Sequence, residues 1–206
     1  MERLYAAEQA IRHHANDVYD PHFMVRPTAW GIVTSALDAL GDSCEALIVY
    51  EQLGLGDHPG EQYLRLYGLL QGVFLQQESI RALCRVFLGH DIKPAAASNW
   101  GQIREIRNMS VAHPIEFTGA GSPDVRHMAI SRITLTDDGF DLYGWNASKQ
   151  DHVWINVNLP GAYEGYKQDA LKYLLRVRGA QRERWAADAT PDGPPYPMEE
   201  IEERGC

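Results

Sequence analysis

The segment from Arg104 to Pro114 holds the residues whose types and spacing are best suited to chemistry. Residues three apart are neighbours on a helix, so the side chains of Arg104, Arg107, Ser110 and His113 are expected along one slanted ridge. An arginine presents a planar fork of donors to phosphate oxygens, and a histidine exchanges protons near neutral pH. The four side chains could therefore face a single phosphate.

An arginine followed closely by a histidine occurs a second time, at Arg85 and His90. A step of five residues points the two side chains apart, because neighbours on one helix face are three or four residues apart. His90 also follows Gly89, which is expected to end that helix. Short motifs of this kind arise by chance, so the residues around each match must decide between them.

Two features favour the match at Arg107. Asn108, a polar residue, follows it directly, and Pro114 ends the expected helix beside His113, whose ring can then project into a cleft. In these residues the chain resembles the HEPN family (higher eukaryotes and prokaryotes nucleotide-binding). Its ribonuclease members carry an arginine, a polar residue and a histidine in this order.

The resemblance implies a homodimer that cleaves RNA without a metal or other cofactor, with the motifs of two chains in one composite active site. On this interpretation His113 takes the proton of a 2′-hydroxyl, which attacks the neighbouring phosphate and leaves a 2′,3′-cyclic phosphate. Arg107 stabilises the charged transition state, and Asn108 orients the histidine or the phosphate. The partner's histidine, or a water, protonates the leaving 5′ oxygen.

Three further residues complete the site that the resemblance implies. Arg104 and Ser110 are expected to bind RNA beside the cleaved phosphate. Glu78 is expected to support the site by pairing with an arginine of the facing helix. The resemblance covers roughly residues 28–114 and includes the helix before the motif.

The resemblance also suggests substrates and partners. RNA, for example tRNA, would be the substrate of a toxin or defence effector, and an antitoxin could be its partner. The rival from another class is a non-catalytic HEPN-like dimeric module that binds a nucleotide, RNA or a partner protein. Two His113 rings converging on one solvent-reachable cleft would favour the enzyme, and a buried His113 would favour the module.

The motif residues also have an ordinary interpretation. A histidine near a helix C-terminus is favoured by the helix dipole alone, so His113 need not be catalytic. An arginine within a helix is usually solvated or paired, and Arg107 could pair with Glu105 or Glu78. Fold analogy by itself does not establish a function, so both interpretations are carried forward.

His13 and His14, with Glu8 and Asp17 nearby, suggest a metal site. Adjacent helical residues diverge by about 100°, so the two rings could share an ion only with help from another helix. We interpret them as boundary residues of an amphipathic helix. A metal-dependent helical-bundle enzyme would need a bound ion with ligands from at least two helices.

Two further groups of side chains have a functional and an ordinary interpretation. The basic residues of the last helix could guide RNA or form a solvated face. The aromatic residues of the expected strands could stack bases, but we expect core or dimer packing. The basic residues are Lys167, Lys172, Arg176, Arg178, Arg182 and Arg184. The aromatic residues are Tyr143, Trp145 and Trp154.

Composition is that of an ordinary globular protein, with 206 residues, 45% of them hydrophobic, and a net charge of -9. Residues 188–206 hold six acids and one base, so residues 1–187 carry a net charge of only -4. No apolar stretch reaches the length of a membrane span, and the N-terminus lacks a secretory signal pattern. The three scattered cysteines do not suggest a disulfide framework. A soluble, cytoplasmic protein without a membrane partner is expected.

Apolar periodicity predicts helices over residues 2–19, 29–53, 61–88, 99–112 and 162–187. Thr28 and Ser98 are expected to cap the second and fourth helices. Alternation predicts strands over residues 128–136, 140–145 and 153–159, with a hairpin turn at residues 137–139. Pro160 is expected to begin the last helix.

The expected fold is mainly α: a HEPN-like helical bundle of about five helices, with a small three-stranded antiparallel sheet inserted before the last helix. One domain over residues 1–187 is predicted, with the β insertion at about 125–159. Residues 188–206 are predicted to be a disordered, acidic, proline-rich tail. The charge of the tail suggests that it could occupy a basic cleft and inhibit the protein.

Overall fold

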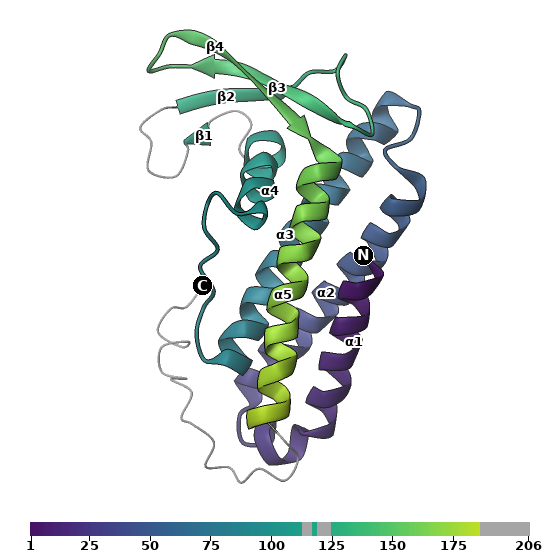
Figure 1. Cartoon of the computed structure of the whole chain (residues 1–206), viewed down its shortest axis with the longest axis vertical. Helices are drawn as coiled ribbons and strands as arrows, with labels where there is room; N and C mark the ends of the chain where they lie inside the picture. Colours follow the sequence, from purple (N-terminus) through teal and green to yellow (C-terminus); the bar gives the residue numbers. More distant parts are fainter. Residues whose placement is uncertain (113–116, 119–124, 186–206) are drawn as a thin grey trace. The chain divides into compact units, whose positions relative to one another are not determined.

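The computed structural model describes residues 1–112, 117–118 and 125–185. It confirms a mainly helical fold with a small antiparallel sheet before the last helix (Figure 1). The α-helices among the described residues are α1 (Glu2–Asp17), α2 (Pro27–Leu53), α3 (Pro59–Leu88), α4 (Asn99–Arg107) and α5 (Leu159–Arg184). Two π-helical turns are η1 (Tyr19–Phe23) and η2 (Asn108–Ala112). The strands are β1 (Phe117–Thr118), β2 (Val125–Ile130), β3 (Gly139–Asn146) and β4 (Asp151–Asn158).

The described chain divides into two compact units. The helices α2, α3 and α5 each contribute residues to both units. The first unit consists of residues 1–45, 75–93 and 170–185, and the second of residues 46–74, 94–112, 117–118 and 125–169. The single domain predicted for residues 1–187 stays a prediction. The predicted acidic tail lies outside the described residues, as does His113.

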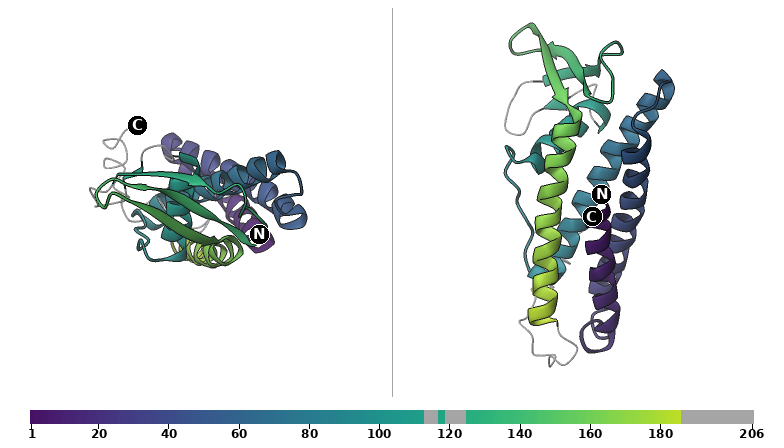
Figure 2. Two further views of the ribbon diagram at one scale, coloured as in Figure 1. Left: turned by 90° about the horizontal axis from the view of Figure 1, so that it is seen from above. Right: turned by 45° about the vertical axis from the view of Figure 1, so that its right-hand side comes forward.

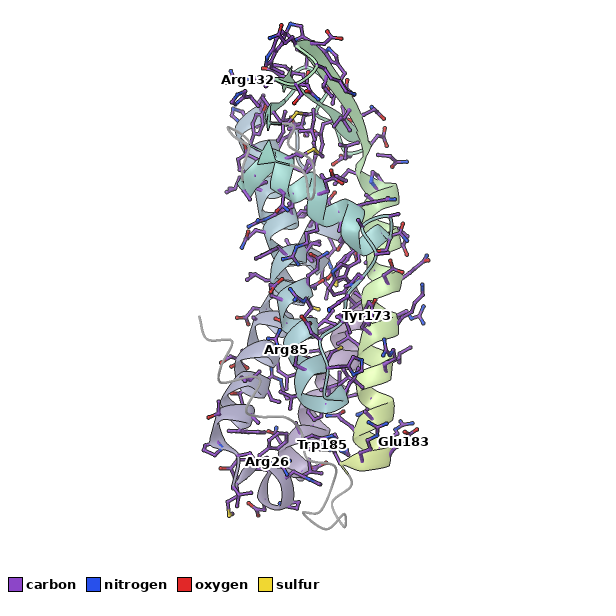
Figure 3. All side chains as sticks on the ribbon, turned by 90° about the vertical axis from the view of Figure 1, so that its left-hand side faces the viewer. Arg26, Arg85, Arg132, Tyr173, Glu183 and Trp185 are labelled. Carbon is purple, nitrogen blue, oxygen red and sulfur yellow. The ribbon has the colours of Figure 1, made fainter. Side chains whose placement is uncertain are left out.

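An aromatic cluster closes one end of the first unit. The ring of Trp185, just after the end of α5, stacks on Phe23 at 5.2 Å and meets Phe87 edge-on at 5.2 Å. Figure 3 shows Trp185 at this end of α5, beside Glu183. Because all three aromatic side chains are buried, they join η1, α3 and α5 in one apolar core.

A buried carboxylate lies between α1 and α2 in the same unit. Glu8 is fully buried, and Arg12 donates from Nε to it at 2.8 Å and from Nη1 to Asp38 at 2.8 Å. Gln9 donates to the other oxygen of Glu8 at 2.8 Å. Both carboxylate oxygens therefore have a partner, as a buried charge requires.

The sheet of the second unit has the strand order β1-β2-β3-β4, all pairs antiparallel. The two-residue β1 adds a short fourth strand to the three that were predicted. In the β3–β4 hairpin, Tyr143 pairs with Trp154 and Trp145 with His152. Residues alternate between the two faces of a strand, so these four side chains share one face. Phe140, on the opposite face, is buried.

The predicted strand 128–136 is wrong in its second half, because β2 ends at Ile130. The side chain of Thr134 accepts the N–H of Asp141 at 2.9 Å, and the N–H of Thr134 donates to Ser131 at 3.3 Å. These bonds draw the chain into a turn instead of a ladder. The predicted tight turn at residues 137–139 is present, closed by reciprocal backbone hydrogen bonds between Thr136 and Gly139.

Helix ends follow the expected signals at two of four positions, and Pro160 is not the first residue of α5, which begins at Leu159. Ser98 accepts the N–H of Gly101 at 3.1 Å, which confirms the cap of α4. Gly89 adopts a φ of 75° after α3 and donates to Arg85, as a C-terminal glycine does. Thr28 is not the cap of α2, because that helix begins one residue earlier at Pro27. Across the described helices, none is long and apolar enough to cross a membrane.

Candidate functional site

The fourth helix is anchored by its apolar face. Trp100 and Ile103 are buried, and the Trp100 ring packs against Tyr166 of α5 at 5.7 Å. The backbone N–H of Trp100 also donates to Asp169 at 3.3 Å. These contacts fix the rotation of α4 about its own axis, and the rotation determines where its other side chains point. In Figure 1, α4 lies beneath the sheet and beside the start of α5.

A second face of α4 meets α3 at two pairs of residues. Arg104 and Arg107 are three apart on α4, and Gln71 and Phe74 are three apart on α3. Both guanidinium groups lie over the Phe74 ring, at 5.0 Å for Arg104 and 4.1 Å for Arg107. Cation–π contacts of this kind are worth about 0.5–2 kcal/mol, more when water is excluded.

The Arg107 guanidinium is held by neutral amide oxygens. Its Nη1 donates to Oδ1 of Asn108 at 3.2 Å, and its Nη2 donates to Oε1 of Gln71 at 3.0 Å. Its Nε is buried without a hydrogen-bond partner in the described part of the chain. Since each Nη carries two N–H groups, one on each remains for an incoming acceptor.

The charge of Arg107 is uncompensated within the described part of the chain, where it forms no ion pair with a carboxylate. Burial lowers the pKa of Arg107, and the nearby charge of Arg104 lowers it further. Both effects disfavour the cation, so an anion placed here would relieve them. The arrangement is therefore suited to binding a phosphate or another oxyanion.

The helix continues from Arg107 into the π-turn η2, so the α-helix predicted over residues 99–112 is wrong in its last turn. The Ser110 hydroxyl donates to the carbonyl of Ile106 at 2.6 Å. That carbonyl is the one that the Ser110 N–H would bond in an α-helix, and this competition loosens helices. Single π-turns are rare in proteins, but those that occur are frequently found at functional sites.

Ser110 itself is buried by this turn. Its expected contact with RNA would require the bond to Ile106 to break, and we leave it out of the site proposed below. Asn108 accepts a hydrogen bond from Arg107, and its expected role in orienting His113 or the phosphate stays a prediction. After Arg107 the chain follows the wider turn η2 as far as Ala112, whereas the predicted ridge assumed an α-helix.

Glu78, the expected supporting acid, belongs to the first unit, where its carboxylate lies 3.4 Å from Arg81. Its pairing with an arginine of α4 stays a prediction. The competing motif at Arg85 and His90 has a different environment: Arg85 lies 4.0 Å from Asp91, and His90 contacts the backbone carbonyl of Leu88 at 3.1 Å. An acid thus already neighbours Arg85, in contrast to Arg107.

We compared the chain with known proteins. No family model, curated protein or solved structure matches it.

His13 and His14, the candidate metal ligands, have different neighbours. The His13 ring lies 3.5 Å from Asp17, and the Nε2 of His14 lies 2.9 Å from the carbonyl oxygen of Trp185. Among the described residues, no three acidic, histidine or cysteine side chains converge as a metal site.

The basic residues of α5 do not form one uniform cationic face. The ammonium of Lys167 lies 2.8 Å from both Glu51 and Glu164. Arg178 donates from Nη1 to the backbone carbonyl of Ala10 at 2.5 Å. The charge of Lys167 is therefore balanced, and part of the Arg178 fork is occupied.

Gln71 and Phe74 are the site residues that the sequence analysis missed. Their spacing of three on a long helix matches that of Arg104 and Arg107, and this was the available signal. An aromatic ring and an amide are ordinary in a helix, however, so the match acquires meaning only when the two helices are seen face to face.

Proposed function

We propose that the chain is a metal-independent endoribonuclease of HEPN type, in which Arg107 binds the phosphate that is cleaved. The observation that carries the proposal is the Arg107 cation, which is half-buried on Phe74, is held by Gln71 and Asn108, and has no carboxylate partner among the described residues. It stands at the position that the motif gives to the phosphate-binding arginine. Positioning by amides leaves the charge available to the ligand.

The proposed reaction needs a base and a charged donor. The oxygen of the 2′-hydroxyl attacks the adjacent phosphorus and the bond to the 5′ oxygen breaks, which leaves a 2′,3′-cyclic phosphate. His113 takes the proton of the 2′-hydroxyl, and the histidine of a second chain, or water, supplies the proton to the 5′ oxygen. Arg107 donates to the phosphate oxygens as their charge grows, and a donor aimed at this charge is worth about 100- to 1,000-fold in rate.

The rival function is a non-catalytic module that binds an anionic ligand, such as a nucleotide or RNA. One observation favours it: the described side chains around Arg107 supply anion binding but no group for proton transfer. On this hypothesis Arg107 variants lose ligand binding, and His113 variants keep it. The proposed enzyme, with tRNA as substrate and an antitoxin as partner, loses its activity in both.

Cleavage of total RNA or tRNA by the purified protein in EDTA tests the proposal, with Arg107→Ala and His113→Ala as variants. The second arginine–histidine pair offers matched controls, Arg85→Ala and His90→Ala. We expect both motif variants to lose at least about 100-fold in rate and the controls to stay within about threefold of wild type. Equal losses in the controls, or no cleavage by wild type, would reject the enzyme.

A further inference from the structure

The sheet presents aromatic side chains on its outer face. Trp154 is 64% exposed, Tyr143 43% and Trp145 39%. The three rings therefore do not pack in the core, and their packing against a second chain, the other expectation, stays a prediction. Seen from above in Figure 2 (left), the strands lie in front of the helices of the second unit.

The opposite face is the buried one. A groove of about 450 Å³ beside β4 is lined by Ile106 of α4, by Met109 of the following turn η2, and by Ile155 and Val157 of the strand. Ile155 and Val157 alternate with Trp154, so α4 covers the face away from the aromatic rings. The outer face is thus left without a covering element among the described residues of the second unit.

The exposed rings are arranged in pairs across the hairpin. Tyr143 and Trp154 lie 5.5 Å apart with 30° between their planes, and Trp145 meets the His152 ring at 5.3 Å. Tyr143 and Trp145 are two residues apart on β3, a separation of about 6.6 Å along the strand. That distance is close to twice the spacing of stacked bases, which is about 3.4 Å.

The area of the patch is too small for a stable protein partner. At 150–250 Å² for a whole aromatic side chain, the exposed fractions leave roughly 220–370 Å² of ring surface. A stable dimer covers about 800 Å² on each partner. The same face carries Asp141 and Asn156, joined by a 2.8 Å hydrogen bond, so the rings lie among polar groups and not in a continuous apolar surface.

We propose that this outer face, comprising Tyr143, Trp145, His152 and Trp154, is a stacking platform for the unpaired bases of single-stranded RNA. Separate rings in polar surroundings suit planar ligands that are apolar on their faces and polar at their edges. The inference that RNA is the occupant rests on the proposed function. It adds a binding surface outside the cleavage motif and selects single strands over duplexes.

The platform is joined to the cleavage motif through the sheet. β2 packs against η2, the turn that follows Arg107, and pairs with β3, which carries Tyr143 and Trp145. A single strand held on the platform is thereby retained on the same unit as the phosphate site. Duplex RNA cannot use the platform, because its bases are already stacked.

The test measures binding of a fluorescent 2′-O-methyl oligouridine, whose blocked 2′ oxygen prevents cleavage, so binding is separated from catalysis. We expect Trp154→Ala and Tyr143→Ala each to weaken binding about tenfold, and Trp154→Phe to restore most of it. Tyr67→Ala, which removes an exposed tyrosine of α3, is the matched control and should leave the affinity unchanged. Circular dichroism verifies that each variant is folded.

Three results would overturn the platform. The wild type could fail to bind the oligonucleotide, the Trp154 and Tyr143 variants could bind it as tightly as wild type, or wild type could bind a duplex of the same length as tightly as the single strand. Sedimentation of the same variants examines the other occupant. Loss of a dimer in Trp154→Ala with unchanged oligonucleotide affinity would assign the face to a second copy of the chain. If wild type binds the oligonucleotide and the platform variants bind it more weakly, but wild type cleaves no RNA, only the proposed enzyme is rejected.

Discussion

The Nη2 atom of Arg107 lies 3.0 Å from Oε1 of Gln71, an uncharged partner for a half-buried cation. Arg81, farther along the same α3 helix, instead contacts both carboxylate oxygens of Asp91, at 3.1 and 2.5 Å. The carboxylate neutralises Arg81, whereas the amide only orients Arg107. The contrast explains why Arg107 is the arginine that we assign to an anionic ligand.

Gln71→Glu should inactivate the site with almost no change in shape. The new carboxylate would lie where Arg107 already donates and would neutralise it, so we expect cleavage to fall at least about tenfold. The melting temperature should stay equal or rise, because an ion pair forms. Gln62→Glu on the same helix supplies the same charge change away from the site. Full activity of Gln71→Glu would show that the charge of Arg107 is not used.

Phe74→Leu removes the ring beneath Arg104 and Arg107 but keeps an apolar side chain. Loss of a cation–π contact of about 0.5–2 kcal/mol corresponds to a fall of about 2- to 30-fold in phosphate binding or kcat/KM. Tyr67→Leu, which removes a ring one to two turns away on α3, is the control. Steady-state kinetics with RNA would contradict the expectation if the two variants were equally active.

Arg107→Lys should not replace arginine. A lysine ammonium cannot present the planar fork that donates to Asn108 and Gln71 together while facing a phosphate. We expect it to lose at least about tenfold in cleavage rate, and Arg107→Ala about 100-fold or more. Arg85→Lys, at the other motif, controls for loss of guanidinium elsewhere. Rescue of activity by lysine would indicate that a point charge suffices.

Glu8 gives the stability a pH dependence. Burial raises the pKa of Glu8 above its ordinary value near 4.5, and the opposing hydrogen bond from Arg12 does not reverse the shift. A raised pKa means that its contribution to stability is complete below pH 4.5 and is lost as the pH rises. Wild type should therefore lose stability between pH 4 and pH 7 relative to Glu8→Gln, which lacks this carboxylate. The difference in the free energy of unfolding, Glu8→Gln minus wild type, should increase over this range.

Urea unfolding at several pH values measures this difference, with Glu2→Gln as the exposed control on the same helix. A difference that shrinks with pH would contradict a destabilising buried charge at Glu8.

Cys84 should be chemically inert in the folded protein. Burial raises the pKa of Cys84 to about 12, so only about one molecule in 10,000 carries the thiolate at pH 8. We expect iodoacetamide to alkylate Cys84 at least about 100-fold more slowly in the native protein than in urea, because the thiolate is the reactive form. Peptide mapping by mass spectrometry measures both rates, and equal rates would disprove the burial.

Apolar periodicity was enough to predict the long helices, because their buried stripes extend over many turns. The predicted third helix, 61–88, differs from α3 by two residues at its start, where Pro59 begins the helix. Two of the errors lie where a hydroxyl bonds to the backbone. Ser110 turns the end of the fourth helix into a π-turn, and Thr134 bends the chain after β2. Periodicity takes no account of such bonds.

The site was predictable only in part, because a motif names residues along one helix. The motif names Arg107 and Asn108, which are in contact, but Gln71 and Phe74 come from another helix. The register of β3 and β4 places the aromatic residues on one face. Which face α4 covers cannot be read from alternation, so the sequence left core packing and dimer packing both open.

The most direct measurement is the chemistry of the RNA ends produced in EDTA by wild type, Arg107→Ala and His113→Ala. The account predicts a 2′,3′-cyclic phosphate on one product and a 5′-hydroxyl on the other, with both products lost in each variant. Products that end in a 3′-hydroxyl, cleavage that disappears in EDTA, or cleavage retained by Arg107→Ala would contradict the assignment of Arg107 to the scissile phosphate.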